Sequence, residues 1–443
     1  MHKTIICIFL ILSAFSCRKS EYLIPGNEVI SDLGGGTGTV TWTKDKSYLI
    51  DGFVFVNDGQ TLSIEAGTVI RAKTGQGSQA SALIVARGGK IIAEGTSDEP
   101  IIFTVEGDDL QGSVPPDTRG LWGGVIILGN APINSPSGEG FIEGIPISEP
   151  RGIYGGTFED DNSGILQYVS IRHGGTDIGE GNEINGLTLG GVGRKTIIHH
   201  IEIISNSDDG LEVFGGNVNL SNIAVAFCGD DAFDFDEGYT GKCQFLLGIL
   251  DDKTGDHVAE HTGNPWGVTP DFFSLPIIYN ATFIGDRTGH DNVLISYEKG
   301  SGGIYRNSLF INNETGISID NSGGFDSYRK INSGELDFSH NIFHNIAGNN
   351  KDSLFILNPK TEDIDIRLAE LNNFFIEERF NTIEDPGIEA DEIPFDLLPV
   401  NTVYSNLAEY QSTWFEKVTY KGAFGSRNWL RGWSLLWSQG IIK

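Results

Sequence analysis

The most chemically suggestive side chains in this sequence are acids that recur at a spacing of 22 residues. If 22 residues form one turn of a coiled chain, each carboxylate lies about 4.8 Å from its copy on the next turn. Carboxylates at that separation repel one another unless a pKa rises, a basic group lies nearby or a divalent cation binds. The pairs are Asp208 with Asp230, Asp209 with Asp231 and Glu212 with Asp234.

Two interpretations of these acids require no catalysis. In the first, Asp209 and Asp231 are turn residues whose side chains accept hydrogen bonds from nearby backbone N–H groups. In the second, the acids bind Ca²⁺, a cation that prefers six to eight oxygen ligands. The calcium ligands would then be Asp208, Asp230, Glu212 and Asp234.

The third interpretation is cleavage of a polysaccharide by Asp209, Asp231 and Asp234. Paired carboxylates can hydrolyse a glycosidic bond as general acid and general base. A Ca²⁺-dependent lyase would also need an Arg or Lys base, and the nearest in sequence are Lys242 and Arg194. Carbohydrate can also bind without reacting. The candidate binding residues are Glu212, Asp234, Asp236 and Trp266.

Two histidine motifs are poor candidates for a metal site. The segment His257–His261 spells the H-x-x-E-H signature of a class of zinc peptidases. That signature works on a helix, whereas here Gly255 precedes it and Pro265 follows it closely. The adjacent His199 and His200 are predicted to lie in a strand, where neighbouring side chains point to opposite faces. We therefore expect neither motif to bind zinc.

A repeat of about two dozen residues predicts the architecture that positions these side chains. One recurring segment is a polar turn residue followed by an apolar, variable, apolar triplet. A second, alternating pattern interleaves with it and has a His or Asn near its middle. Alternation predicts strands with one buried face, and this period without helical spacing predicts the coils of a β-solenoid. The first pattern is defined by Leu187, Leu211, Phe233, Val293 and Ile317, and the second by His200, Asn222, Asn280, Asn307 and Asn341.

The predicted fold class is therefore all-β, a right-handed parallel β-helix with a mixed C-terminal capping segment. The solenoid is predicted to span residues 40–358, with Gly- and Pro-rich insertions near 130–164 and 251–276. Asn side chains at the recurring bend are expected to bond one another along the stack. In the C-terminal segment, 359–443, we predict a helix over 364–379 and an aromatic tail that caps the open end of the solenoid.

The first residues resemble an export signal. Lys3 precedes an apolar run, Ile5–Leu12, that is too short to span a bilayer. We predict a signal peptide over 1–16, lipidation of Cys17 and a tether over 17–39. The expected location is the outer membrane, lipid-anchored and surface-exposed, with a secreted or periplasmic protein as the alternative.

The composition limits the partners that we expect. The formal charge is −30, from 60 acidic and 30 basic residues, and an acidic surface repels nucleic-acid phosphates and anionic lipid headgroups. We therefore expect no nucleic-acid partner and membrane contact only through the lipid anchor. Cys228 and Cys243 are predicted either to form a disulfide or to be two small buried hydrophobic residues.

Several longer runs are similar to a known family. Together they resemble exported bacterial β-helix proteins, many of them lipoproteins, over nearly the whole mature chain, although residues 256–261 depart from the usual pattern. Gly229-Asp230-Asp231 also resembles part of the catalytic stack of polygalacturonase-type β-helix hydrolases, whose Gly-His-Gly and Arg-Ile-Lys motifs are missing here. The exported family has no established activity. We expect a surface module that binds polysaccharide or an outer-membrane partner, because an elongated solenoid offers a long side surface to a polymer. A polysaccharide-degrading enzyme is the alternative. The runs are Tyr48–Val56, Ala82–Ile91, Gly120–Gly129, Ser207–Gly216 and Gly229–Asp231.

Overall fold

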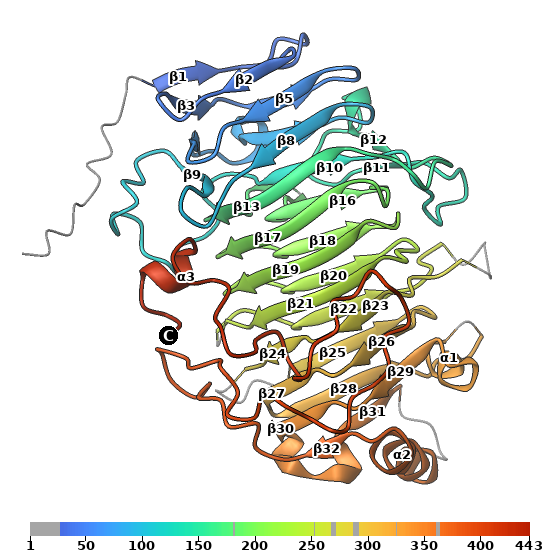
Figure 1. The fold of residues 1–443 in the computed structure, drawn as a ribbon. Helices are drawn as coiled ribbons and strands as arrows, with labels where there is room; N and C mark the ends of the chain where they lie inside the picture. The colour runs from blue at the N-terminus through green and yellow to red at the C-terminus, as the bar shows by residue number, and fades with distance from the viewer. Residues whose placement is uncertain are drawn as a thin grey trace, which may run out of the picture.

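The strands of this protein stack in successive turns along one axis, as Figure 1 shows for a computed structural model of the chain. The prediction of an all-β, right-handed parallel β-helix is confirmed. The structure describes residues 27–179, 182–251, 253–266, 272–286, 292–324, 326–359 and 364–443. Cys17, the predicted lipidation site, lies outside the described residues.

Two long parallel sheets, sheet A and sheet B, form the walls of the solenoid. Each coil contributes one short strand to sheet B and one long strand or two short strands to sheet A. In the described residues sheet B comprises β4 (Phe53–Val56), β7 (Ala82–Val85), β10 (Val125–Leu128), β16 (Leu187–Gly190), β18 (Leu211–Phe214), β20 (Phe233–Asp236), β22 (Ala259–Thr262), β25 (Val293–Glu298), β28 (Thr315–Asp320) and β31 (Phe355–Asn358).

The strands of sheet A bend around the opposite side of the core. They are β1 (Asn27–Ile30), β2 (Val40–Trp42), β3 (Ser47–Ile50), β5 (Thr61–Ile64), β6 (Val69–Ala72), β8 (Lys90–Glu94), β9 (Ile101–Val105), β13 (Gly164–Arg172), β17 (Ile197–Ile204), β19 (Asn219–Ala226), β21 (Lys242–Ile249), β23 (Ile277–Tyr279), β24 (Thr282–Ile284), β26 (Gly303–Arg306), β27 (Leu309–Asn313), β29 (Leu336–Ser339), β30 (Ile342–Ile346) and β32 (Thr382–Ile383).

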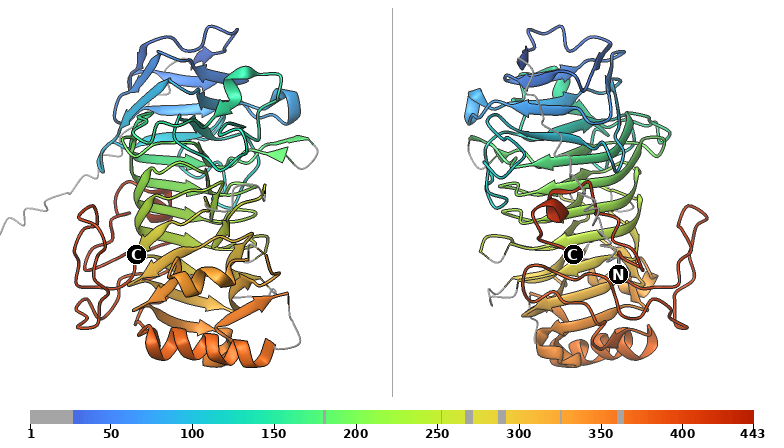
Figure 2. Two further views of the ribbon diagram at one scale, coloured as in Figure 1. Left: turned by 90° about the vertical axis from the view of Figure 1, so that its right-hand side faces the viewer. Right: turned by 60° about the vertical axis from the view of Figure 1, so that its left-hand side comes forward.

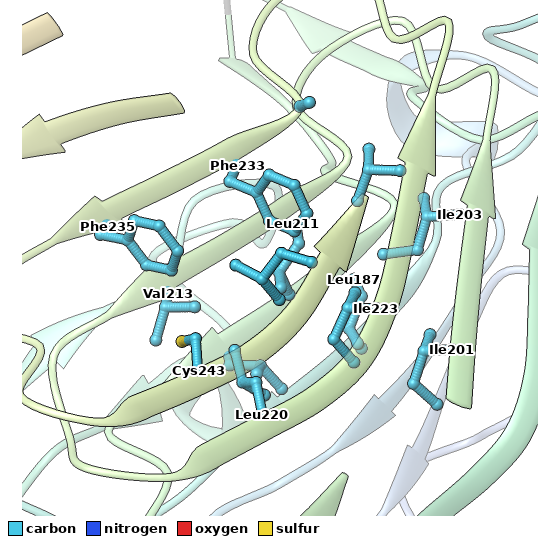
Figure 3. Packing of buried hydrophobic residues seen from close by; sticks show 14 of the residues in the cluster. Leu187, Ile201, Ile203, Leu211, Val213, Leu220, Ile223, Phe233, Phe235 and Cys243 are labelled. Carbon is cyan, nitrogen blue, oxygen red and sulfur yellow. The ribbon is translucent and has the colours of Figure 1, made fainter. Parts of the chain in front are cut away.

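The predicted register holds through the middle of the solenoid. Leu187 pairs with Leu211, and Leu211 pairs with Phe233. Their side chains are fully buried and stack inside the coil, as Figure 3 shows. The prediction is two residues out in a later coil, because Ile295 rather than Val293 pairs with Ile317. Both residues suit the alternating pattern, so the sequence did not distinguish them.

A left-handed backbone conformation recurs at the bend in sheet A. His200, Asn222, Asn280 and Asn307 all have φ near +55°, a region that Asn adopts more readily than most residues. The predicted ladder between these amides is largely replaced by bonds to backbone. Asn280 Nδ2, for example, donates to the carbonyl oxygen of Tyr420 at 2.9 Å. Asn341 lies one residue past the bend.

The two predicted insertions behave differently. Residues 130–164 form a long excursion between β10 and β13, and its short hairpin consists of β11 (Gly140–Phe141) and β12 (Ile153–Tyr154). Tyr154 packs this insertion against Phe214 on the outer face of sheet B. The prediction for 251–276 is wrong in part, because β22 within it is a regular strand of sheet B that pairs with β20.

The C-terminal end of the solenoid is closed by helix α2 (Ile364–Asn373) and the π-helical turn 374–378, which confirms the predicted helix. Phe375 from this turn is fully buried and stacks on Phe355, with ring centroids 4.3 Å apart. Helix α1 (Tyr328–Ser333) lies between β28 and β29. The capping function is therefore performed by residues that precede the aromatic tail.

The aromatic tail does not cap the open end, which corrects that prediction. Residues 384–443, which we call the C-terminal strap, run back along the outer face of sheet A to helix α3 (Leu435–Ser438), as Figures 1 and 2 show. The strap covers two outward columns of mostly apolar residues. Those columns contain Ala224, Leu247, Leu309 and Ile342, and Ile204, Ala226, Ile249, Ile284 and Ile311.

The structure also revises the N-terminal boundary and the cysteine prediction. Strand β1 lies within the predicted tether but pairs with β3, so the solenoid begins before residue 40. Cys228 and Cys243 are free and buried, which supports the buried-hydrophobe alternative. Within the described residues we find no helix of the length and apolar character needed to cross a membrane.

Candidate functional site

The outer face of sheet B carries a column of acids. Glu212 pairs with Asp234 and Asp234 with Glu260 along β18, β20 and β22. Their neighbours Leu211 and Phe233 point into the core, so alternation directs the acids outward. This stacking was predicted for Glu212 and Asp234. We call these three residues and the four turn aspartates, Asp208, Asp209, Asp230 and Asp231, the acidic column.

Two of the turn aspartates connect successive coils. Asp209 Oδ1 accepts a hydrogen bond from the backbone N–H of Asp231 at 2.9 Å. Asp231 Oδ1 in turn accepts from the backbone N–H of His257 at 2.7 Å and lies 3.0 Å from its Nδ1. Both aspartates are buried. This geometry is that of the first interpretation, in which the side chains satisfy backbone groups.

Two residues that the sequence analysis missed complete the site. Asn185, from the turn before β16, donates through Nδ2 to Glu143 Oε1 at 2.6 Å and also to Glu212 Oε2. Glu143 belongs to the insertion 130–164, which packs over sheet B. The spacing of the repeat carries no information about an insertion, so no sequence signal pointed to Glu143. Asn185 occupies the same position in its coil as Asp209 does in the next coil. The repeat could therefore have identified Asn185 as a residue of the site.

Burial and mutual repulsion disfavour ionisation along the column. Burial, followed by neighbouring carboxylates, raises the pKa of Asp208 to about 8 and that of Asp230 to about 6. The same causes raise the pKa of Glu260 to about 7, and they hold the pKa values of Glu212 and Asp234 well above the usual range. The acidic column therefore binds protons unless a cation replaces them.

His257 is the basic group in direct contact with the column. Burial lowers its pKa, but the hydrogen bond and charge of Asp231 outweigh this effect and raise the pKa to about 9. His257 Nδ1 also lies 3.7 Å from carboxylate oxygens of Asp256 and Glu260. One imidazolium can offset the charge of only one of the surrounding carboxyl groups when they ionise.

The carboxylates form groups with the spacing of metal ligands. Three groups each bring ligand atoms within 4.8 Å of one another: Asp208, Asp209 and Asp230; Asp209, Glu212 and Asp234; and Asp231, Asp256 and His257. The four predicted calcium ligands thus fall into two adjacent groups that share Asp209, rather than into one. Two groups consist only of oxygen ligands, which suits Ca²⁺.

Two buried oxygens in the site lack a hydrogen-bond donor. Among the described residues, Asp234 Oδ1 and Asn185 Oδ1 have no partner, and Asn185 is fully buried. An unsatisfied buried acceptor costs about 1–3 kcal/mol. A bound cation would satisfy both atoms, because carboxylate and amide oxygens are its usual ligands.

The remaining predicted residues lie at the edge of the site or outside it. Asp236 occupies the next outward position of β20, and its Oδ1 accepts from the backbone N–H of Glu237 at 2.5 Å. Trp266 lies in the segment after β22 with its side chain 48% exposed. Arg194 forms ion pairs with Glu159 and Asp160 of the insertion. Lys242 begins β21 in sheet A, so neither predicted base joins the acidic column.

The two histidine motifs have opposite outcomes. His261 lies on β22, fully buried, with Nε2 2.9 Å from the Tyr305 hydroxyl, as expected for a strand rather than a zinc-binding helix. The prediction that His199 and His200 point apart is wrong. His200 has φ +55°, so the strand bends there and the two Nδ1 atoms lie 2.9 Å apart.

Comparison with known proteins agrees with this architecture. The family model described as a pectate-lyase-like β-helix domain matches residues 34–379, which include the acidic column and Glu143. No curated protein and no solved structure matches the chain significantly. The match covers most of the chain and coincides with the solenoid. The chain therefore belongs to the pectate-lyase-like β-helix family.

Proposed function

We propose that this protein is a surface module that binds polysaccharide on the outer face of sheet B, with Ca²⁺ held by the acidic column. The observation that carries the proposal is the pair of all-oxygen ligand groups that share Asp209. The unsatisfied oxygens of Asp234, in one of these groups, and of Asn185, which donates to Glu212, support a cation as the missing partner. A bound cation would also present open coordination positions to the hydroxyl or carboxylate groups of a sugar.

The shape of sheet B supports a polymeric ligand. Beyond Glu260, the outward positions continue in register through Ser296 and Ser318. A pocket of about 210 Å³ lies on these later coils. Successive coils repeat about every 4.8 Å, so a linear chain laid along the axis meets similar polar groups at each step. The pocket is lined by Ser296, Tyr297, Glu298, Lys299, Ser318, Asp320, Asn358 and Pro359.

A binding assay with a panel of neutral and acidic polysaccharides, with Ca²⁺ or with a chelator, tests this function. We expect retention on at least one immobilised glycan with Ca²⁺ and loss of retention with the chelator. The Asp234→Asn and Glu212→Gln variants should lose Ca²⁺-dependent retention. The exposed Asp98, remote in sequence from the column, provides the control Asp98→Asn. Equal retention with and without Ca²⁺ would disprove the role of the cation.

Polysaccharide cleavage is the second candidate function, and the contact between Glu143 and Glu212 favours it. Both groups have raised pKa values because they are buried, and a protonated carboxyl beside a carboxylate can act as a general acid. Against this, ligand atoms of Glu212, Asp234 and Asp209 lie within 4.8 Å of one another. This spacing is too short for an inverting hydrolase, whose carboxyls lie roughly 6.5–9.5 Å apart to admit water, and is closer to the roughly 5–5.5 Å of retaining hydrolases.

The same panel separates the enzyme from the binding module. New reducing ends would indicate a hydrolase and unsaturated products a lyase. Either product should disappear in Asp234→Asn if the column is catalytic, and Asp231→Asn provides a second test. Retention without any product favours the binding module.

We also propose that the protein is attached to the outer membrane through a lipid on Cys17. The support is the predicted signal that precedes this cysteine. Metabolic labelling with a fatty acid should mark the wild type and fail to mark Cys17→Ala. Protease treatment of intact cells would then tell whether the solenoid faces outward.

A further inference from the structure

The paired histidines of β17 form a feature that the acidic column does not use. His199 and His200 are half-buried on the outer side of sheet A, at the bend where the strand adopts a positive φ. Without a metal, their Nδ1 atoms share a hydrogen bond at 2.9 Å, in which one ring donates and the other accepts. Neighbouring side chains of a regular strand diverge, so this convergence depends on the left-handed conformation of His200.

Aromatic packing fixes the ring of His200. It stacks on Tyr168 from the preceding coil, with centroids 4.4 Å apart. Trp429 of the C-terminal strap meets the His200 ring edge-on at 5.9 Å. A ring held from two sides loses little freedom when it binds a ligand, which favours a preorganised site.

The separation of the nitrogens matches one class of metal ion. Two imidazole nitrogens bound at about 2.0–2.1 Å lie about 2.9 Å apart at a right angle, and about 3.3 Å apart in a tetrahedral site. Right-angled positions occur in the tetragonal geometry of Cu²⁺ and Ni²⁺, and Cu²⁺ heads the affinity order of divalent first-row ions. Burial lowers the pKa of His199 and lowers that of His200 to about 4, which keeps both rings neutral at pH 7.

We propose that His199 and His200 bind a divalent transition-metal ion, Cu²⁺ before Ni²⁺, through their two Nδ1 atoms. Water or other donors would complete the coordination. This site is separate from the acidic column, because it lies on β17 of sheet A, whereas the column lies on sheet B and its turns. It is independent of the proposed polysaccharide function. Imidazole nitrogens favour transition-metal ions such as Cu²⁺ and Ni²⁺, whereas the carboxylate oxygens of the column favour Ca²⁺.

The residues at equivalent positions of neighbouring coils suggest substitutions that should preserve the bend. Asn222 occupies the position of His200 on the next coil, between the paired residues Ser221 and Ile223, and has the same φ of +55°, so His200→Asn introduces a residue that this backbone already accepts. Ser221 pairs with His199, so His199→Ser is equally conservative. His340 has φ +60° at the same bend, with a single imidazole, and His340→Asn is the control.

The test is titration of the full chain with CuCl₂ by calorimetry in excess Ca²⁺, together with electron paramagnetic resonance of the Cu²⁺ complex. We expect one Cu²⁺ site with splitting from two nitrogens and quenching of tryptophan fluorescence through Trp429. His199→Ser and His200→Asn should each weaken that site at least about tenfold, and His340→Asn should leave it unchanged. Circular dichroism checks that each variant is folded.

Other outcomes would overturn the proposal. Unchanged Cu²⁺ affinity in both variants, or a spectrum without nitrogen splitting, would mean that the pair is only a hydrogen bond between two neutral rings. An equal loss in His340→Asn would mean nonspecific binding by surface histidines. If a variant fails to fold, the nitrogen splitting and fluorescence quenching of the wild type still decide the question.

Discussion

In the middle coils of the solenoid, the outer faces of the two sheets carry opposite chemistry, although the same coils build both. On sheet A, outward positions such as Ala226, Ile249 and Ile284 are apolar and lie under the C-terminal strap. On sheet B, the corresponding outward positions of β18, β20 and β22 carry Glu212, Asp234 and Glu260. The core positions of both sheets, in contrast, are mostly apolar.

This difference distinguishes the inward residues, which the solenoid needs for its stability, from the outward residues, which can contact partners. Inward residues must be apolar because each coil buries them against the next. Outward residues are free of that constraint, so their chemistry indicates the partner of each face. The apolar face of sheet A has a partner in this chain, the strap. The acidic face of sheet B carries carboxyl groups whose ionisation is disfavoured by burial and by one another in the folded chain, which favours a cation from outside as the partner of this face.

The largest effect should come from removing a large side chain of the strap. Trp433 is 3% exposed and meets Tyr168 edge-on at 5.4 Å. Trp433→Ala should lower the free energy of unfolding by about 3–5 kcal/mol, measured by chemical denaturation. Trp414 is 38% exposed, and Trp414→Ala should cost less than about 1 kcal/mol. Similar losses in both variants would contradict the view that the strap is part of the core.

The second effect is stabilisation of the acidic face by its cation. At a free Ca²⁺ concentration one hundred times the dissociation constant, the wild type should gain about 2.7 kcal/mol of stability. Asp234→Asn should lose most of this gain, because it weakens one ligand group, whereas Asp98→Asn should retain it. Thermal unfolding with and without Ca²⁺ measures the gain. No shift in the wild type would contradict the cation site.

The third effect concerns a carboxylate of sheet A that is buried under the strap. Glu202 is fully buried and accepts bonds from the N–H groups of Leu435 and Leu436 at 2.8 and 2.9 Å and from the Ser170 hydroxyl at 2.6 Å. Glu202→Gln should destabilise the protein by about 2 kcal/mol. Glu389 pairs with Lys443 on the surface, and Glu389→Gln should change the stability by less than about 1 kcal/mol. Chemical denaturation compares the two variants.

The last effect is the pH dependence of the cation-free protein. Unfolded Asp and Glu ionise near pH 4, whereas Asp208 and Asp236 have pKa values of about 8 in the folded chain because they are buried. Between these pH values the folded state binds more protons, so stability falls as pH rises. His257, with its pKa raised to about 9, acts in the same direction above pH 6.5.

We expect the midpoint of thermal unfolding to fall between pH 5 and pH 8 in the presence of a chelator. Glu212→Gln should flatten this dependence, because it removes one of the repelling charges. Saturating Ca²⁺ should reverse it, since deprotonated ligands bind the cation better. A midpoint that instead rises with pH in the presence of the chelator would contradict this prediction, because it would mean that the folded state does not bind more protons than the unfolded state.

Particular residues show how far sequence reasoning extends. Leu187, Leu211 and Phe233 were aligned correctly because each must be buried at the same point of its coil. Glu212 and Asp234 followed from the same alignment. Glu143 could not be found in this way, because an insertion has no fixed register with the repeat. The convergence of His199 and His200 was missed because the sign of φ at a bend is not encoded in alternation.

The sequence by itself determined the coil, its buried residues and the stacking of acids, because a period of two within a repeat leaves one way to bury every apolar side chain. Only the tertiary structure decided what lies on the outer faces. The strap, the insertion bearing Glu143 and the bend at His200 depend on contacts between residues far apart in the chain or on local backbone geometry. These features produce no periodic pattern in the sequence, so only the folded structure reveals them.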